Sequence, residues 1–135
     1  MAKVVLTNAS ITINSVDLST YANNVELVYE VDSVESTAFG SGGHTFVGGL
    51  QNVSCNVDLM QDFAATKVEA TVYPLVGTTT TIVVKADSGA VSATNPSYTI
   101  TDAFLASHTP VAAAVGEMAM TSLSFTGGTL AKATS

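Results

Sequence analysis

Residues 58–77 read Asp58-Leu-Met-Gln-Asp-Phe-Ala-Ala-Thr-Lys-Val-Glu-Ala-Thr-Val-Tyr-Pro-Leu-Val-Gly77, and they decide the fold, because only here does the hydrophobic spacing depart from that of a β-strand. Asp62 is a good N-cap residue, since its carboxylate can accept from the free N–H groups of a first helical turn. Apolar residues then recur every three or four positions, as on one face of a helix: Ala64, Val68, Val72 and Leu75. Pro74 and Gly77 favour an end between residues 73 and 77. The pattern predicts one helix, over about 62–76, that packs its apolar stripe on a sheet.

The sequence on both sides of this helix is typical of β-strands. From Val25 to Asp32 every second residue is apolar, which predicts a buried face with Val25, Leu27, Tyr29 and Val31 and a wet face with Glu26, Val28, Glu30 and Asp32. Residues 50–60 alternate in the same way, with Val53, Cys55, Val57 and Leu59 inward and Asp58 among the outward residues. Further β segments are expected at 3–7, 9–13, 78–86, 98–101, 103–107 and 117–125, with a connection at 108–114. The chain is therefore predicted to be mainly β.

Length and cysteine content indicate one domain, residues 1–135, that folds without disulfides. A chain of 135 residues can bury about two-thirds of its unfolded surface. Cys55 is the single cysteine, and a small buried core thiol is its expected role. The first residues contain no apolar run of signal-peptide length, and no run is long enough to span a bilayer. We expect a soluble protein that is made in the cytoplasm and has no membrane partner.

Charge is sparse and strongly acidic. Eleven acidic residues face four lysines, arginine is absent, and the formal net charge is −7. Such a chain lacks the cations that neutralise phosphates, which excludes nucleic-acid binding of the ordinary kind. Only 11% of the residues are charged, while 47% are hydrophobic. Because interface cores are depleted of charge, this composition favours a surface largely covered by other subunits over a monomer with threonine-rich exposed faces.

A glycine-rich segment, residues 39–49, is expected to form a flexible hairpin loop. It contains five glycines, but no Gly-Lys-Ser/Thr and no helix start follows, which argues against a phosphate-binding loop. Loops of this length in compact domains usually contact partners. His44 within it has no second ligand at metal spacing. At the other end, Gly127 and Gly128 close the last predicted strand and leave residues 129–135 as a tail that a partner could order.

No catalytic, cofactor or metal site is predicted. The two histidines lie far apart in the sequence, and no Gly-x-Ser-x-Gly elbow is present. The acids of residues 26–32 share a strand face on which solvated charge is the ordinary state. A spatial pair of carboxylates, as in glycosidases, stays open as an alternative, because such pairs need not be neighbours in sequence.

The chain resembles the small major tail proteins, or tail tube proteins, of long-tailed bacteriophages over about residues 25 to 130. The resemblance rests on short motifs in a fixed order: Val34-Glu35-Ser36-Thr37, Phe39-Gly40, Gly49-Leu50, Asp58 to Asp62 with Gln61-Asp62, Pro74-Leu75-Val76-Gly77, Ala93-Thr94-Asn95-Pro96, Val115-Gly116-Glu117 and Phe125-Thr-Gly-Gly-Thr. The sequence departs from the family near Lys132, because it lacks the arginine expected there.

This resemblance implies a β-sandwich or half-barrel flanked by one helix, assembled as hexameric rings that stack into a tube. It implies a virion tail protein that is assembled in the cytoplasm of the host bacterium, with other copies of itself and other tail proteins (tape measure, tail terminator and distal tail) as partners. DNA would pass through the tube without specific binding. An acidic lumen would prevent DNA from sticking, and the candidate lining residues are Glu26, Glu30, Asp32 and Asp58. The candidate inter-ring loop residues are Phe39, Gly40, Gly42, Gly43, His44 and Phe46.

Two other functions stay open. A head-decoration or head–tail completion protein of a phage would share the acidity and the low charge density. A monomeric β-sandwich that binds carbohydrate would need an exposed aromatic platform, and the chain has no tryptophan and only four tyrosines.

Overall fold

The computed structural model of this chain describes residues 5–65 and 67–134, and most of its regular secondary structure consists of strands. The elements are β1 (Ser10–Ile13), β2 (Val16–Asp17), β3 (Ala22–Glu35), β4 (Phe46–Met60), α1 (Val68–Val72), the 3-10 turn η1 (Tyr73–Leu75), β5 (Thr79–Lys85), β6 (Ser97–Ala112), β7 (Met120–Thr126) and β8 (Thr129–Ala133). No helix in these two ranges is long and apolar enough to cross a membrane.

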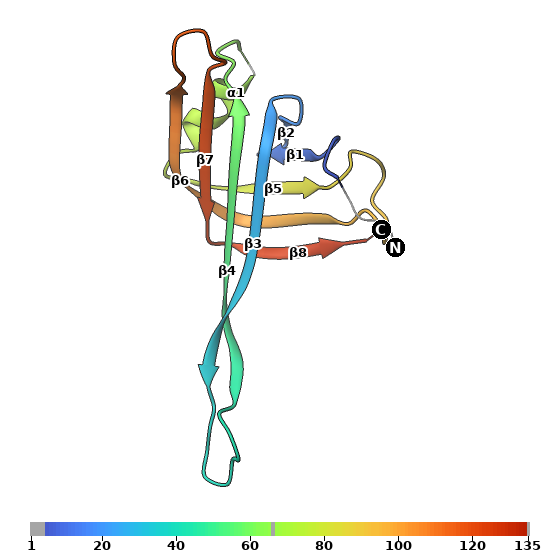
Figure 1. The fold of residues 1–135 in the computed structure, drawn as a ribbon, viewed down its shortest axis with the longest axis vertical. Helices are drawn as coiled ribbons and strands as arrows, with labels where there is room; N and C mark the ends of the chain where they lie inside the picture. The colour runs from blue at the N-terminus through green and yellow to red at the C-terminus, as the bar shows by residue number, and fades with distance from the viewer. Residues whose placement is uncertain (1–4, 66, 135) are drawn as a thin grey trace.

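The strands form one antiparallel sheet that folds over into two layers. Its order is β2-β1-β5-β6-β7-β4-β3, and β8 pairs with β6. The first part of β6 lies between β5 and β8, and its second part pairs with β7. In Figure 1, β3, β4 and β7 run vertically while β5, β8 and the first part of β6 cross them. This arrangement confirms the predicted sandwich or half-barrel, and β6 is the strand that joins the two layers.

The core lies between these layers. Its buried side chains come from both of them and from α1: Ile11, Ile13, Leu18, Val53, Cys55, Val57, Leu59, Val68, Val72, Ile82, Val84, Ile100, Ala103, Leu105, Leu123 and Phe125. The predicted inward face of β4 is confirmed, and Cys55 is a fully buried thiol whose pKa burial raises to about 12. The predicted inward face of β3 is only half right. Val25 and Leu27 pack against the core, but Tyr29 is 53% exposed and Val31 is 44% exposed.

The predicted helix exists but is shorter than residues 62–76. It begins at Val68 and ends, through η1, at Leu75. Asp62 is not its N-cap: the Asp62 Oδ1 atom accepts from the N–H of Ala64 at 2.9 Å and the Oδ2 atom from the Tyr21 hydroxyl at 3.0 Å. These bonds turn the chain before the helix starts, so Ala64 stays exposed and outside the apolar stripe. Val68 and Val72 are fully buried, as their spacing predicts.

Several segments expected to be irregular are strands. Residues 46–49 of the glycine-rich segment belong to β4, where Val47 pairs with Val34. Residues 108–112 continue β6, where His108 pairs with Leu123. Residues 129–133, expected to be a tail, form β8 along the first part of β6.

At the N-terminus the strands also differ from those expected at 3–7 and 9–13. The predicted strand 3–7 lies partly outside the described residues, and residues 5–7 are not a strand. A hairpin instead joins β1 to β2 through Asn14 and Ser15. Their φ angles of 51° and 68° are those of a two-residue hairpin turn.

The outer half of the β3–β4 hairpin leaves the body of the molecule. We call residues 29–52 the arm, and every one of them is exposed. Figure 1 shows the arm as a long two-stranded projection below the two layers. A register shift between Val31 and Ser33 marks a bulge in the arm. The body therefore contains all of the core, and the arm contains none of it.

Candidate assembly surfaces

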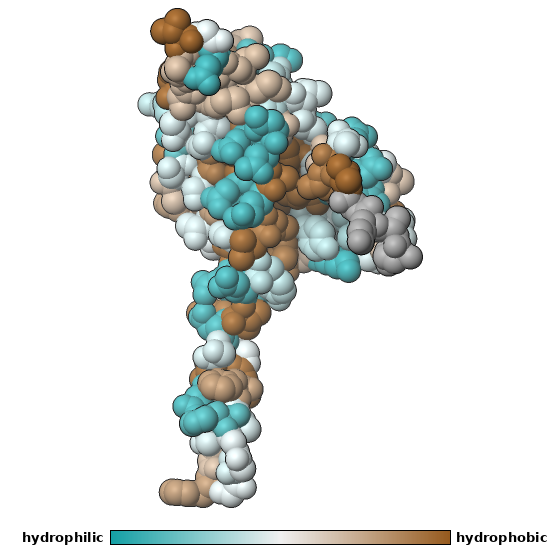
Figure 2. Space-filling view, in the orientation of Figure 1, coloured by the Kyte–Doolittle hydropathy of each residue, from teal (hydrophilic) through white to brown (hydrophobic). Residues whose placement is uncertain are grey.

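The four predicted lumen residues lie on one face of the molecule. Glu26, Glu30 and Asp32 alternate along β3 with the residues that face the core side, and Asp58 occupies the equivalent outward position on β4. Glu26 is paired with Asn56 and Glu30 with Asn52, so the side chains of each pair share a face. We call this outer face of β3, β4 and β7 the acidic face. Figure 2 shows hydrophilic side chains gathered over β3 and β4.

Neutral donors bind three carboxylates of the acidic face, those of Glu26, Asp32 and Asp58. The Nδ2 atom of Asn52 donates to Asp32 Oδ1 at 2.6 Å, and that of Asn56 donates to Glu26 Oε1 at 3.4 Å. Asp58 accepts from Asn24 Nδ2 at 3.1 Å and from the Ser122 hydroxyl at 2.8 Å. Amides and hydroxyls orient these groups without cancelling their charge. The three described lysines, Lys67, Lys85 and Lys132, stand before α1, on β5 and on β8, so β3, β4 and β7 contain none.

The layer that carries the acidic face has two open edges. Among the described residues, β3 pairs only with β4, so its second edge is free along its length. On the opposite side, residues 106–112 of β6 pair only with β7. Pro110 lies in this segment, as is typical of an edge strand. Free edges of this length favour pairing with another chain.

The predicted inter-ring residues lie at the end of the arm. Phe39, Gly40, Gly42, Gly43 and His44 belong to the turn, and Phe46 is the first residue of β4. Phe39 is fully exposed, and Phe46 is 58% exposed. The turn has internal hydrogen bonds, from Ser36 N to Thr45 O at 2.8 Å and from Thr45 N to Thr37 Oγ1 at 2.9 Å.

His44 has a partner that its sequence spacing did not indicate. Its Nδ1 atom lies 2.5 Å from Glu35 Oε2, across the hairpin. This contact, followed by the bond from the Thr37 hydroxyl, holds the pKa of Glu35 below its ordinary value. In the described part of the chain, no three His, Cys, Asp or Glu side chains are placed to hold a metal ion. His44 thus binds Glu35 within the arm.

Sequence reasoning missed an apolar groove beside β3. We call it the groove: it has a volume of about 420 Å³ and opens between β3 and the crossing strands β5, β6 and β8. Its apolar lining includes Leu6, Val25, Leu27, Tyr29, Tyr98 and Leu130. The exposed part of the predicted buried face of β3 was the available signal, since an apolar residue such as Tyr29 without a core behind it must face something else.

A second apolar surface lies at the opposite edge of the same layer. Tyr73, Val76 and Pro110 surround a hollow of about 340 Å³ together with His108, and we call these three residues the edge patch. Tyr73 is 65% exposed and Val76 is 43% exposed. Sequence reasoning did not identify this surface, because Tyr73 and Val76 fall where the helix was expected to end.

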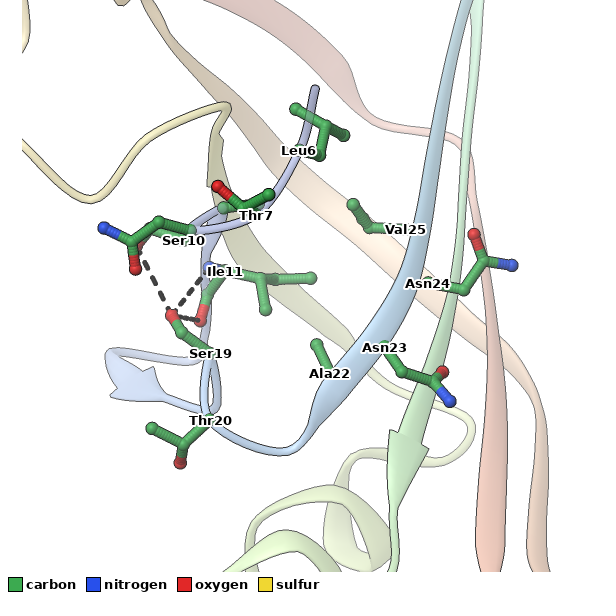
Figure 3. A pocket seen from close by; sticks show the side chains of 12 residues that line it. Leu6, Thr7, Ser10, Ile11, Ser19, Thr20, Ala22, Asn23, Asn24 and Val25 are labelled. Carbon is green, nitrogen blue, oxygen red and sulfur yellow. Dashed lines mark hydrogen bonds between the residues drawn. The ribbon is translucent and has the colours of Figure 1, made fainter. Parts of the chain in front are cut away.

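A polar hollow lies near the start of β3, and unlike the groove and the edge patch it is not an apolar surface. It has a volume of about 450 Å³ and lies between residues 6–11 and 19–25. Figure 3 shows Ser19 pointing toward Ser10 and Ile11, and its hydroxyl lies within hydrogen-bonding distance of the Ile11 N–H, at 3.0 Å. The Ser19 hydroxyl also donates to Asp17 Oδ1, so it already has hydrogen-bond partners within the chain.

A buried polar network fixes the helix to the acidic layer. The side chain of His108 is 4% exposed, with Nδ1 at 3.1 Å from Thr121 Oγ1 and Nε2 at 3.2 Å from Glu69 Oε2. Gln61 Nε2 donates to the same Glu69 oxygen at 3.1 Å and to the Pro110 carbonyl at 2.6 Å. These bonds join α1 to β6 and β7. The network is structural, and the expectation that the chain is not an enzyme stays a prediction.

Comparisons with known proteins find similarity in structure rather than in sequence. No protein-family model and no curated protein match the chain. A chain of the PVC sheath-tube complex, an extracellular contractile injection system in its extended state, matches with a TM-score of 0.71 at 11% identity, over 98% of this chain and 93% of that one. A chain of the virion of a native gene transfer agent particle matches with a TM-score of 0.71 at 14% identity, over 97% of this chain and 98% of that one.

A third match comes from the tail of an empty gene transfer agent particle with C6 symmetry. Its TM-score is 0.56 at 20% identity, over 82% of this chain and 81% of that one. At these identities the likeness shows the fold. The chain shares the fold of components of phage-like tails and injection systems, as the resemblance to tail tube proteins implies.

Proposed function

We propose that this chain is the structural subunit of the tail tube of a phage or phage-like particle, and that its copies assemble into stacked rings around a conduit for DNA. The observation that carries the proposal is the acidic face, which lies on a layer with two unpaired edges. The shared fold with tail and injection-system components supports it.

The rings form by edge pairing. The free edge of β3 in one copy pairs with residues 106–112 of β6 in the next, which continues the acidic layer from subunit to subunit. Because the two edges differ, the contact is head-to-tail, and it closes when the rotation between copies completes a circle. Closure removes every free edge of this layer. Six copies per ring are our preferred number, supported by the C6 symmetry of the similar gene transfer agent tail.

The acidic face lines the lumen of this ring. Glu26, Glu30, Asp32 and Asp58 then repeat around the conduit, with the Ser122 and Ser124 hydroxyls beside them. DNA phosphates are repelled by carboxylates and find no lysine on β3, β4 or β7 to bind, so the duplex slides without being held. This is the role that the net charge of −7 supports.

Stacking uses the arm. Its outer apolar residues, such as Phe39 and Phe46, are exposed to solvent, and an isolated two-stranded hairpin is marginally stable in water. We place the arm turn, with Phe39 and Phe46, against the neighbouring ring. The first and last rings each keep one unstacked face, which other tail proteins must cover.

Electron microscopy of negatively stained protein at high concentration tests the assembly. We expect rings or tubes of uniform diameter. A monodisperse monomer at every salt concentration, also after addition of a tail initiator, would contradict the proposal and favour a decoration or completion protein.

The lining is tested on assembled tubes by changing Glu26, Glu30 and Asp32 together to lysine. We expect tubes to form as before but to retain short duplex DNA in a salt-dependent way, because cations at the wall bind phosphate. A matched variant with the same residues changed to glutamine and asparagine separates lost repulsion from gained attraction. Lysine variants that form tubes without retaining DNA would place this face outside the lumen.

A further inference from the structure

We propose that the joint between neighbouring copies has a second, apolar part, in which the edge patch of one copy fills the groove of the next. The groove is then a binding site for another copy of this chain. This inference rests on the proposed ring assembly and names the surfaces that would hold the ring together behind its lumen wall.

The groove continues the core, and none of the described residues fills it. Val25, Leu27 and Tyr29 line it from the core side of β3, and Tyr98 and Leu130 line it from the crossing layer. Figure 2 shows hydrophobic side chains beside the hydrophilic patch over β3 and β4. Lys85 is the charged residue of the lining, and its Nζ atom donates to the Gly89 carbonyl at 3.1 Å. An apolar occupant therefore fits the groove better than a charged one.

The edge patch lies on the same side of the acidic layer as the groove. His108, which helps to line its hollow, is bonded to Glu69 of α1, and α1 packs on the core side of this layer. Val76 lies beside the point where the free edge of β6 begins, because Gly77 N donates to the Leu105 carbonyl at 3.0 Å and Leu105 N donates to Thr78 O at 3.1 Å, just before residues 106–112. The patch is thus an apolar projection beside the edge that pairing would use.

Strand register sets the two surfaces at the same height. Across the layer, Leu105 of β6 is paired with Phe125, Phe125 with Cys55, and Cys55 with Leu27. These four paired residues form one row across the layer. The row begins at Leu105, beside Val76, and ends at Leu27, which lines the groove. When β3 of one copy pairs with β6 of the next, Val76 and Tyr73 come to the level of the groove. When a sheet closes into a barrel, neighbouring strands are shifted along their length relative to each other. The groove extends along β3 from Val25 to Tyr29, so the edge patch would still meet it after such a shift.

The geometry selects a second copy as the occupant. The groove and the edge patch lie at opposite edges of one layer, on one side of it and on one row, so a single head-to-tail contact covers both. The contact removes apolar surface from water on both partners and leaves no charged group of the edge patch to desolvate. Each subunit then offers one groove and one patch, and a closed ring uses all of them.

Cross-linking of paired cysteines tests the contact. We would prepare Val76→Cys and Tyr29→Cys, singly and together, and treat each at assembling concentration with a flexible bis-maleimide. The native Cys55 is a clean background, because it is fully buried and its pKa is raised to about 12. We expect no cross-link within either single variant, dimers from their mixture, and a ladder that stops at the ring size from the double variant.

A matched control places the second cysteine elsewhere. Ala90→Cys lies in the exposed loop after β5, and we expect its mixture with Tyr29→Cys to stay uncross-linked. Tubes that form while Val76→Cys and Tyr29→Cys fail to cross-link would overturn the apolar joint and leave the proposed function standing. A monomer that forms neither tubes nor cross-links would overturn both.

A charge in the patch gives an independent readout. Val76→Asp would bury an unpaired carboxylate in the joint, and we expect it to raise the protein concentration needed for assembly by roughly tenfold or more. Val76→Thr, of similar size, should raise it much less. Unchanged assembly of a folded Val76→Asp variant would overturn the inference, and circular dichroism checks the fold of each variant.

Discussion

The body and the arm contain strands of the same kind, but different things hold them in place. In the body, strands from two layers cover each other, and residues such as Leu59 and Phe125 are almost completely buried. In the arm, β3 and β4 continue their pairing past the last core residue, Val53, and every side chain meets solvent. The body is therefore stabilised by burial within the chain. The arm has backbone pairing but no core, and the stacking proposed above is what would cover its apolar side chains.

The sharpest way to test this contrast is to remove one phenyl ring from each region. Phe125→Ala leaves a cavity in the core and should lower the free energy of unfolding by about 3–5 kcal/mol. Phe46→Ala removes a ring that is 58% exposed and should change it by less than about 0.5 kcal/mol. Urea denaturation of the monomer measures both. A large loss from Phe46→Ala would mean that the arm contributes to the stability of the body.

Substitution of a glycine in each region should give the next largest difference in the free energy of unfolding. Gly128 has a φ angle of +87°, and a Cβ atom there would lie 2.3 Å from the Thr101 carbonyl oxygen, so Gly128→Ala should cost at least about 1–3 kcal/mol. Gly42, in the arm turn, has nothing within 4 Å of a built Cβ. Gly42→Ala should stay within about 0.5 kcal/mol of the parent. Thermal unfolding followed by circular dichroism separates the two, and equal effects would contradict the tight turn between β7 and β8.

The smallest effect concerns two acids with lowered pKa values. Ser19 lowers the pKa of Asp17 in the body by donating from its hydroxyl and its N–H, and His44 lowers that of Glu35 in the arm. A lowered folded pKa stabilises the folded form above the unfolded pKa, and this stabilisation is lost as the pH falls through the folded value. The unfolded values are about 3.8 for Asp17 and 4.5 for Glu35.

We therefore expect Asp17→Asn to lower the unfolding midpoint at neutral pH, by an amount that starts to shrink as the pH falls below about 3.8, the ordinary Asp17 value, and is lost once the pH has passed the lowered folded value. Glu35→Gln should leave the midpoint unchanged at every pH, because the arm does not pack on the core. NMR titration of the Glu35 carboxylate in the parent checks the local effect. A shift of the global midpoint by Glu35→Gln would show coupling between arm and body.

Alternation predicted the strands well, because the side-chain period of two is local. It correctly assigned the inward residues of β4, from Val53 to Leu59, and the outward position of the acids on β3. It failed where the outcome depends on what lies opposite the strand. Tyr29 and Val31 continue the apolar pattern of Val25 and Leu27, but the second layer ends before it reaches them. The sequence of a strand does not record where its neighbouring layer stops.

The helix and the candidate surfaces show the same limit. Val68 and Val72 were identified by spacing, but the start of the helix was missed, because Asp62 bonds to Ala64 and Tyr21 instead of capping it. The acidic face was identified because alternation places its members on one side. The groove and the edge patch were not found, since each collects residues from strands or turns far apart in the sequence, as Tyr29 and Leu130 do in the groove.

The shared strand β6 has a further consequence, for the way the molecule opens. Its residues pair with β5 and β8 in one layer and with β7 in the other, so neither layer can detach while β6 stays in place. Amide hydrogens in the middle of β6 should then exchange with solvent only through complete unfolding, and those of the arm should exchange through local fraying. In exchange experiments the chain would behave as one cooperative unit with a single fast-exchanging appendage.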